Sequence, residues 1–373
     1  MNYSQRHLEL NAQFQLGKDI HLDESNIDIR FFTFRSLQHQ IVDENIKLNP
    51  VDANIDENLV FTYPIFFPHG KQRTSNAILL LHGLNERNWS KYLTWAEYLC
   101  ESTGKPVILF PIAFHMNRSP QTWCNPRFMQ PIMDLRRTRN GKDRSLSFAN
   151  VAFSERISEN PLRFYNSGRQ SLYDLAQLFE DIKIGNHPLF NENTHIDIFA
   201  YSIGAFLAEI TLMTNLHGLF SDSKLFVFCG GGVFRSMSGE SRTIMDKKAY
   251  ESLFNYYLND FAGDIKFDIT RDKVSETFYS MISQERNQHE REQFFNQLGN
   301  QVKGISLIRD KVMPYWGMSD AFGTDFAASR IAQLDFPFSY SHENPFPVGD
   351  LSEFDAVDNS FIHIFSEAAQ FLA

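Results

Sequence analysis

The chain has 373 residues, of which 43% are hydrophobic and 21% are charged, a composition typical of a folded globular protein rather than a disordered one. This length allows one large α/β domain with insertions or two smaller domains. The formal net charge of −10 argues against nucleic acid or an anionic membrane surface as the main partner, because both attract basic patches.

Residues 1–70 form a polar N-terminal extension in which we expect two strands, Ile27–Phe34 and Asn58–Phe67. Pro64 and Pro68 would confine the second strand to a sheet edge or a bent end, since proline has no N–H to donate to a neighbouring strand. We expect this extension to supply the leading strands of a sheet.

Buried strands alternate with amphipathic helices through residues 71–373, which we predict to form one domain. The expected strands are Ala77–Gly83, Pro106–Pro111, His195–Ala200, Lys224–Gly232, Val302–Asp310 and Ala332–Tyr340. The expected helices are Asn88–Thr103, Gly168–Ile182, Ile203–Gly218 and Ser360–Leu372. Such alternation is typical of βαβ units and predicts a mostly parallel sheet with helices on both faces.

Two long segments interrupt this alternation and are predicted to be insertions. The first, at about 112–167, has no clear hydrophobic period, and the second, at about 233–300, is polar and helix-prone. The basic cluster Asp134–Ser145 lies in the first segment. We predict that it is a solvated loop, with phosphate or carboxylate binding as the alternative.

Ser202 stands at the joint between a predicted strand and the helix that follows it, in the stretch Ala200–Gly204 (AYSIG). This stretch is close to G-x-S-x-G, in which a strained strand-to-helix turn exposes a nucleophilic serine and small residues let the two backbones pass closely. Alanine replaces the first glycine but keeps that position small. The alternative is a helix N-cap, because serine is a favoured cap. The motif alone does not decide between the two.

Two further residues with suitable chemistry follow later strands. Asp310 comes directly after the strand GISLIR, and His342 lies two residues beyond the strand QLDFPFSY. A carboxylate at such a place can orient a histidine, and the histidine can act as general base and then as general acid. The order Ser, Asp, His is that of the α/β-hydrolase type rather than the chymotrypsin or subtilisin types.

Backbone donors for an oxyanion are also available near Ser202. Leu84 follows His82 and Gly83 at the end of the first buried strand, and Ile203 begins the helix after the serine. The N–H groups of Leu84 and Ile203 could form a two-donor oxyanion hole.

At these motifs the chain resembles the α/β-hydrolase superfamily, through LLLHGL, AYSIGA, IRDKVMP and a histidine after the last strand. The resemblance covers about residues 59–373 and looks like that of an uncharacterised bacterial branch, so it implies no substrate. It implies an α/β fold with a mostly parallel eight-stranded sheet, helices on both faces, and a helical cap after the sixth strand, where residues 233–300 fall. It also implies acyl transfer to water through a serine ester, with no cofactor.

Other candidate residues fit these roles less well. His363 lies on an apolar face of the last predicted helix, which is more typical of a packed histidine than a catalytic one. Asp320 and Asp325 lie further from the strand end than Asp310. The sequence has no H-E-x-x-H, phosphate-loop or dinucleotide motif, so we expect neither a catalytic metal nor a cofactor.

The sequence therefore predicts a serine hydrolase that cleaves an ester, thioester or related acyl bond, with Ser202, His342 and Asp310 as its triad. The 36 phenylalanines indicate a large aromatic core, with an apolar pocket as the alternative. The Phe-rich predicted cap and the apolar composition favour a small-molecule substrate with a hydrophobic or aromatic acyl group over a sugar or a peptide. Three alternatives stay open. They are a catalytically inactive binding or scaffold protein of the same fold, a serine peptidase, and a C–C bond hydrolase.

The location of the protein is predicted from what the sequence lacks. Cys100, Cys124 and Cys229 are too few and too scattered for a disulfide framework. The N-terminal residues have no apolar segment of a secretory signal, and no window resembles a membrane span. We expect a cytoplasmic protein. The sequence does not indicate its oligomeric state.

Overall fold

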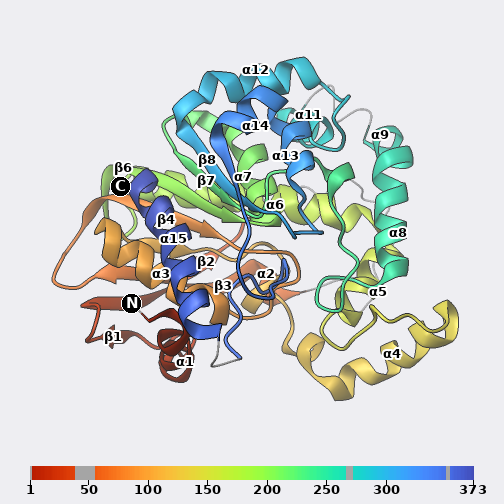
Figure 1. Ribbon diagram of the computed structural model, residues 1–373, viewed down its shortest axis with the longest axis horizontal. Helices are drawn as coiled ribbons and strands as arrows, with labels where there is room; N and C mark the ends of the chain where they lie inside the picture. Colours follow the sequence, from red (N-terminus) through yellow and green to blue (C-terminus); the bar gives the residue numbers. More distant parts are fainter. Residues whose placement is uncertain (1, 38–54, 266–271, 350–352) are drawn as a thin grey trace.

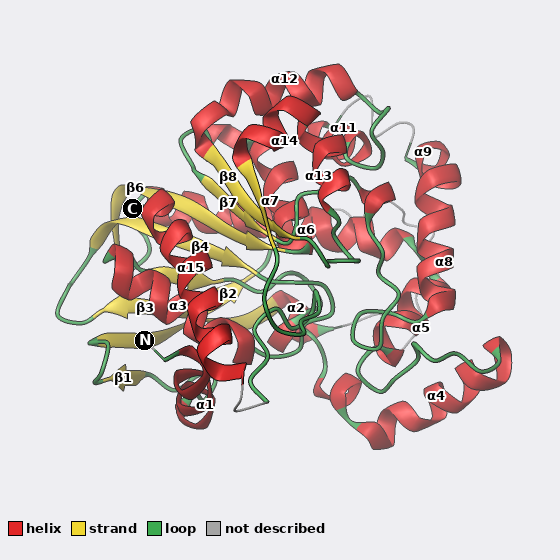
Figure 2. Cartoon of the chain, in the orientation of Figure 1, coloured by secondary structure: helices red, strands yellow, loops and turns green. Residues whose placement is uncertain are grey.

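Nine strands form one sheet in the part of the chain that the computed structural model describes, residues 2–37, 55–265, 272–349 and 353–373. The strands lie in the spatial order β1-β2-β3-β5-β4-β6-β7-β8-β9 and fan across the molecule in Figure 2. Their bounds are β1 Ile20–Leu22, β2 Ile27–Arg35, β3 Val60–Pro68, β4 Thr74–Leu81, β5 Val107–Leu109, β6 Phe190–Tyr201, β7 Leu225–Phe228, β8 Val302–Leu307 and β9 Ile331–Leu334.

The sheet is mostly parallel, as predicted. Strands β5, β4, β6, β7, β8 and β9 run parallel to one another, while β1, β2 and β3 add an antiparallel end that pairs with β5. The sheet has nine strands rather than eight because β1 pairs with Ile27–Ile29 of β2 and extends the antiparallel end. A strand of three residues is too short to show a hydrophobic period, so sequence analysis missed it.

Helices cover both faces of this sheet (Figure 1). On one face lie α1 Tyr3–Gln13, α3 Ser90–Thr103 and α15 Phe354–Leu372. On the other lie α6 Leu162–Lys183, α7 Ile203–Thr214, α13 Tyr315–Phe322 and α14 Thr324–Arg330. The remaining helices are α2 Asp56–Leu59, α4 Pro126–Asn140, α5 Val151–Glu159, α8 Lys247–Asn255, α9 Phe261–Asp264, α11 Lys273–Ser280 and α12 Gln288–Leu298.

The two helical layers bury alternate residues of the same strands. In β6, Ile198 and Ala200 face the layer of α6 and α7, while Phe199 and Tyr201 face the layer of α3 and α15. This is the two-residue period of a strand, and burial on both sides explains why β6 reads as a continuous apolar run. The strand therefore enters the turn at Ser202 with both of its faces packed.

Pro64 and Pro68 were predicted to confine the strand at 58–67 to a sheet edge or a bent end, and the edge position is wrong. Strand β3 lies inside the sheet, between β2 and β5. It pairs with β5 only through Ile65 and Phe66, and Pro64 and Pro68 lie outside this short pairing. The two prolines are therefore accommodated at positions that do not pair with β5, where β5 needs no N–H donor from β3.

The basic cluster at 134–145 was predicted to be a solvated loop. Most of its residues are exposed, as predicted, but residues 134–140 are helical, so the loop is wrong for that part. Helix α4 runs through Asn140 and projects from the body of the molecule (Figure 2). Arg136 on this helix is buried and donates two hydrogen bonds to Asp246, at 2.7 Å each, and one to Glu155, also at 2.7 Å. Its charge is thus neutralised within the protein.

The two segments outside the strand–helix alternation are both rich in helix. Residues 112–167 hold α4, α5 and the start of α6, and residues 233–300 hold α8, α9, α11 and α12 within their described parts. Among the residues that the structure describes, no helix has the length and apolarity needed to cross a membrane.

A buried ion pair joins the N-terminal extension to the rest of the molecule. Arg118 and Asp174 both have fully buried side chains and are 2.7 Å apart. Arg118 also donates to the carbonyl oxygens of Asn58 and Pro111, and Asp174 accepts from the Ser36 hydroxyl. The pair therefore ties α6 to the segments that flank β3.

Replacing Arg118 by methionine should lower the free energy of unfolding by about 3–5 kcal/mol, because the Asp174 carboxylate would stay buried without its counter-charge. The matched control is Arg235→Met, which breaks an exposed ion pair with Glu285 and should cost less than about 1 kcal/mol. Urea denaturation of the two variants measures both values, and equal losses would contradict this assignment.

Candidate active site

The structure brings three of the predicted site residues into one hydrogen-bonded chain. Ser202 follows β6, Asp310 lies just beyond β8, and His342 lies in the loop after β9. The Ser202 hydroxyl donates to His342 Nε2 at 2.7 Å, and His342 Nδ1–H donates to Asp310 Oδ2 at 2.7 Å. A carboxylate only accepts, so the proton lies on Nδ1, and Nε2 is left as the acceptor for the serine.

Ser202 has a strained backbone. Its φ of 57° and ψ of −124° fall where residues other than glycine are rare. Although it occupies the N-cap position of α7, its side chain makes no capping hydrogen bond. The hydroxyl bonds to His342 instead, so the alternative of an ordinary helix cap does not describe this serine. Strain of this kind costs about 1–3 kcal/mol and tends to occur at functional sites.

Small residues allow this turn to form. A Cβ atom on Gly204 would lie 2.7 Å from the Leu81 carbonyl oxygen and 2.8 Å from that of His82, so α7 starts in direct contact with the end of β4. A Cβ on Gly230 would lie 2.7 Å from the carbonyl oxygen of Ser202 itself. Both contacts are too short for any side chain, so the sequence AYSIG folds as a tight turn between three strand ends.

Asp310 is held on both sides of its carboxylate. Its Oδ1 accepts the backbone N–H of Val312 at 2.8 Å and of Met313 at 2.9 Å, which leaves Oδ2 for His342. Cys229, at the end of β7, is a buried neighbour. Burial and the nearby Asp310 charge raise the pKa of the Cys229 thiol well above its ordinary value, so it is neutral beside this carboxylate.

Tyr201 positions the histidine, a role that sequence analysis missed. Its hydroxyl donates to the His342 carbonyl oxygen, and the two rings are stacked at 5.5 Å with an interplanar angle of 16°. Burial raises the pKa of the Tyr201 phenol well above its ordinary value, which keeps it a donor. The variable position of the elbow motif carries no signal for such a contact, which links residues that are 141 positions apart.

His82 has a structural role at the end of β4. Its Nε2 accepts from the Ile112 N–H at 2.9 Å, and its Nδ1–H donates to the Gly83 carbonyl oxygen at 2.8 Å. Complete burial lowers the pKa of His82 to about 3, so the ring is neutral. These bonds fix the turn that carries Leu84. Within the described residues, the N–H groups of Leu84 and Ile203 have no hydrogen-bond acceptor.

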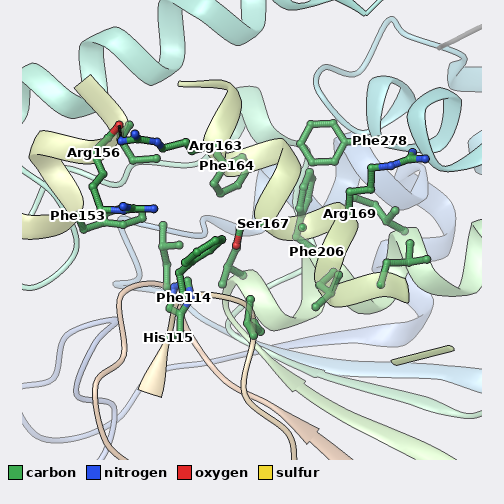
Figure 3. A pocket seen from close by; sticks show the side chains of 18 of the residues that line it. Phe114, His115, Phe153, Arg156, Arg163, Phe164, Ser167, Arg169, Phe206 and Phe278 are labelled. Carbon is green, nitrogen blue, oxygen red and sulfur yellow. Dashed lines mark hydrogen bonds between the residues drawn. The ribbon is translucent and has the colours of Figure 1, made fainter. Parts of the chain in front are cut away.

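Two cavities meet at Leu84 and Ile203. The smaller, of about 430 Å³, is lined by Ser202 and by side chains that include Met237, Met245, Val312 and Met313. The larger, of about 810 Å³, is lined mainly by apolar and aromatic side chains. Figure 3 shows Phe114, Phe153, Phe164, Phe206 and Phe278 around it, with Arg156, Arg163 and Arg169 at its walls. Leu84, Ile203 and Phe164 line both cavities.

His115 in the wall of the larger cavity was also missed. Its Nδ1–H donates to the Ala113 carbonyl oxygen at 2.8 Å, and burial lowers its pKa to about 3. The ring is therefore neutral where it lines the cavity. His115 lies in the segment 112–167, whose sequence has no clear hydrophobic period, so its burial could not be predicted from the sequence.

The less favoured candidates lie elsewhere. His363 on α15 has an exposed side chain 3.5 Å from Glu367, so the prediction that it packs in the core is wrong. Asp320 and Asp325 lie on α13 and α14. Within the described residues, neither carboxylate makes a polar contact with His342. Asp310 is thus the acid that meets the histidine.

The packing at Gly204 gives a direct test of this turn. Gly204→Ala should lower the free energy of unfolding by about 1–3 kcal/mol, because the new methyl group would clash with the Leu81 and His82 carbonyl oxygens. Gly168→Ala is the matched control, since its Cβ would meet only Phe278 at 3.8 Å. In the middle of α6 this change should be neutral or stabilising by about 0.5–1 kcal/mol. Chemical denaturation distinguishes the two. Equal stability of both variants would contradict the close approach.

A mostly parallel sheet with helices on both faces and a serine on a strained strand-to-helix turn is the α/β-hydrolase fold. Similar solved structures are a carboxyl esterase 2 from the fungus Tuber melanosporum, with 9% identity over 99% of this chain and 96% of that chain and a TM-score of 0.49, and a bacterial heroin esterase, with 11% identity over 100% and 91% and a TM-score of 0.49. An esterase from the archaeon Pyrobaculum calidifontis has 10% identity over 99% and 90% and a TM-score of 0.43.

No curated protein matches the sequence. The bacterial branch suggested by the sequence motifs stays a prediction. One family matches along residues 1–373 and is described as a family of unknown function, DUF6051. This match spans the whole chain. The chain therefore belongs to the family of unknown function DUF6051.

Proposed function

We propose that this protein is a serine hydrolase that cleaves an ester, thioester or related acyl bond of a small molecule. The observation that carries the proposal is the hydrogen-bonded chain from Ser202 through His342 to Asp310, with the serine on a strained turn. A hydroxyl held against a neutral imidazole that is itself held by a carboxylate is the arrangement that activates serine as a nucleophile.

The reaction follows from these contacts. As Ser202 Oγ bonds to the substrate carbonyl carbon, His342 Nε2 takes its proton. The bond to the leaving group then breaks, and the leaving group takes that proton from Nε2. Water attacks the resulting serine ester in the same way, giving a carboxylic acid and the free serine. Asp310 keeps the ring in the Nδ1–H form and stabilises the imidazolium that forms between the two transfers.

The Leu84 and Ile203 amides would bind the oxyanion. Each N–H is without an acceptor among the described residues, and both residues line the cavity that also contains Ser202. Ile203 is also the first residue of α7, so the positive end of the helix dipole favours negative charge there. Backbone donors of this kind typically contribute about 100-fold or more each to the rate.

The two cavities suggest how a substrate lies. A leaving group must receive its proton from His342 Nε2, so it departs on the side of the histidine. The smaller cavity is on that side, because Val312 and Met313 line it and also hold Asp310. The larger cavity has no lining residue from the loops of Asp310 or His342. We therefore assign the acyl group to the larger cavity and the leaving group to the smaller one.

The character of the larger cavity supports a hydrophobic or aromatic acyl group. Its walls carry five phenylalanines, which offer apolar surface to a bound group. Phe114 and Phe153 come from the segment 112–167, and Phe278 comes from the segment 233–300. We propose that the second segment is a cap over the site and that the first completes its walls.

The rival functions fit this site less well. An inactive scaffold protein would have no use for the strain at Ser202 or for its bond to His342. Ser202 and His342 are only 2% and 5% exposed, which leaves little room for a folded polypeptide substrate. A C–C bond hydrolase could use the same triad and is the alternative that substrate tests must exclude.

The cytoplasmic location stays a proposal from the sequence alone.

Labelling with a fluorophosphonate tests the nucleophile. The wild-type protein should be labelled once, and Ser202→Ala should not be labelled, because the reagent needs the activated hydroxyl. Ser221→Ala removes an exposed serine hydroxyl and serves as a matched control that should label normally. Loss of labelling only in Ser202→Ala supports the proposal. Labelling of Ser202→Ala at the wild-type level would assign the nucleophile to another residue.

Steric blocking tests the assignment of the cavities. Ile210 lines the larger cavity seven residues along α7 from Ile203, or about 10 Å at the rise of an α-helix. Ile210→Trp should lower kcat/KM for p-nitrophenyl decanoate by at least about tenfold and leave p-nitrophenyl acetate unchanged. Ile184→Trp, at an exposed site, is the control.

Leu253→Trp makes the reciprocal change in the smaller cavity. It should lower kcat/KM for esters of bulky alcohols and leave kcat/KM for esters of long-chain acids unchanged. If Ile210→Trp and Leu253→Trp had the opposite selectivities, the two assignments would be exchanged while the hydrolase itself stood.

A further inference from the structure

A group of metal-ligating side chains lies on the antiparallel strands of the N-terminal extension. It consists of His21 on β1, Asp28 on β2 and His69 just after β3. His21 is the direct cross-strand partner of Asp28. Asp28 is also paired with Phe67, so His69, two residues further on, emerges on the same face as the diagonal neighbour. The strand register therefore brings the three side chains together from three separate segments.

The atoms that could bind a metal ion already face one another. His21 Nδ1 and His69 Nδ1 lie 2.8 Å and 3.0 Å from the same oxygen, Asp28 Oδ1. One ligand atom from each residue lies within 4.8 Å of the others. In a tetrahedral zinc site with Zn–N distances of 2.0–2.1 Å, neighbouring ligand atoms are about 3.3 Å apart. Around such an ion the two nitrogen–oxygen distances, now 2.8 Å and 3.0 Å, would lengthen by about 0.3–0.5 Å.

The donor set selects the class of ion. Two imidazole nitrogens and one carboxylate oxygen suit Zn²⁺ and other late first-row divalent ions, whereas Mg²⁺ and Ca²⁺ prefer oxygen ligands. Neutral imidazole binds a metal through the nitrogen without a proton. Each ring would therefore move its proton from Nδ1 to Nε2, and no proton need leave the protein.

The surroundings support such a site. Asp28 Oδ1 is the oxygen that both histidines contact, while Oδ2 accepts from Arg30 at 3.3 Å and also lies 3.2 Å from His69 Nδ1. The other ring nitrogen of His21, Nε2, lies 3.5 Å from Asp23 Oδ1. When the metal is bound at Nδ1, the Nε2–H group can donate a hydrogen bond to this carboxylate. The histidine side chains are 39% and 51% exposed, so an ion has a path of entry and a fourth position open to water.

We propose that His21, Asp28 and His69 form a binding site for Zn²⁺ or a related transition-metal ion. The ion would join β1, β2 and the turn after β3, and so stabilise the antiparallel end of the sheet. It takes no part in acyl transfer, because Ser202 and its partners come from the parallel part of the sheet. This proposal therefore stands or fails independently of the hydrolase proposal.

Isothermal titration of the metal-stripped full chain with ZnCl₂ tests the site. The wild-type protein should bind one equivalent. His21→Gln and His69→Gln should each weaken binding by at least about tenfold. The matched control is His363→Gln, which removes an exposed histidine beside a carboxylate on α15 and should bind as the wild type does. MgCl₂ should give no binding at this site.

A thermal melt provides a second readout. Zn²⁺ should raise the melting temperature of the wild type and of His363→Gln but not of His21→Gln or His69→Gln. Melts in EDTA show whether the variants fold as the wild type does. Absence of Zn²⁺ binding by the wild type, or equal binding by all four proteins, would overturn the proposal and leave the group as a hydrogen-bonded contact between strands.

Discussion

The strained backbone of Ser202 is the constraint on which the site depends. Ser202 has its φ of 57° in a turn with no room for larger neighbours, because a Cβ on Gly204 would lie against the Leu81 and His82 carbonyl oxygens and a Cβ on Gly230 against the Ser202 carbonyl oxygen. Such a conformation persists only where the surrounding structure determines it. The apolar layers on both faces of β6 provide that determination. The core and the turn at Ser202 are therefore parts of one packing arrangement, and a change in the first alters the second.

Burial keeps the polar neighbours of the triad uncharged. It lowers the pKa of His82 to about 3 and raises the pKa values of Tyr201 and Cys229 well above their ordinary values. His82 fixes the turn before Leu84, and Tyr201 holds the His342 loop. Because none of the three is charged, none of them competes with the Asp310 carboxylate for the His342 ring. Neutral, hydrogen-bonded neighbours thus define both the position and the electrostatics of the proposed reaction.

The sequence predicted those features that depend on local pattern. Strand–helix alternation gave the parallel sheet, and the order of Ser202, Asp310 and His342 after strand ends gave residues that the structure places in contact. Features set by long-range packing were not predicted. Strand β1 is too short for a period, and the contact of Tyr201 with His342 joins distant segments. Arg136 was read as solvated because its buried partner Asp246 lies 110 residues away.

The central claim is that acyl transfer passes through a covalent ester on Ser202. Rapid mixing of the protein with p-nitrophenyl butyrate, an acid quench and intact-mass measurement with peptide mapping tests it most directly. The account predicts a burst of one p-nitrophenol per protein, with the mass of one butyryl group added to the peptide that contains Ser202. Hydrolysis with no acylated protein, or a butyryl group on any other residue, would contradict the account.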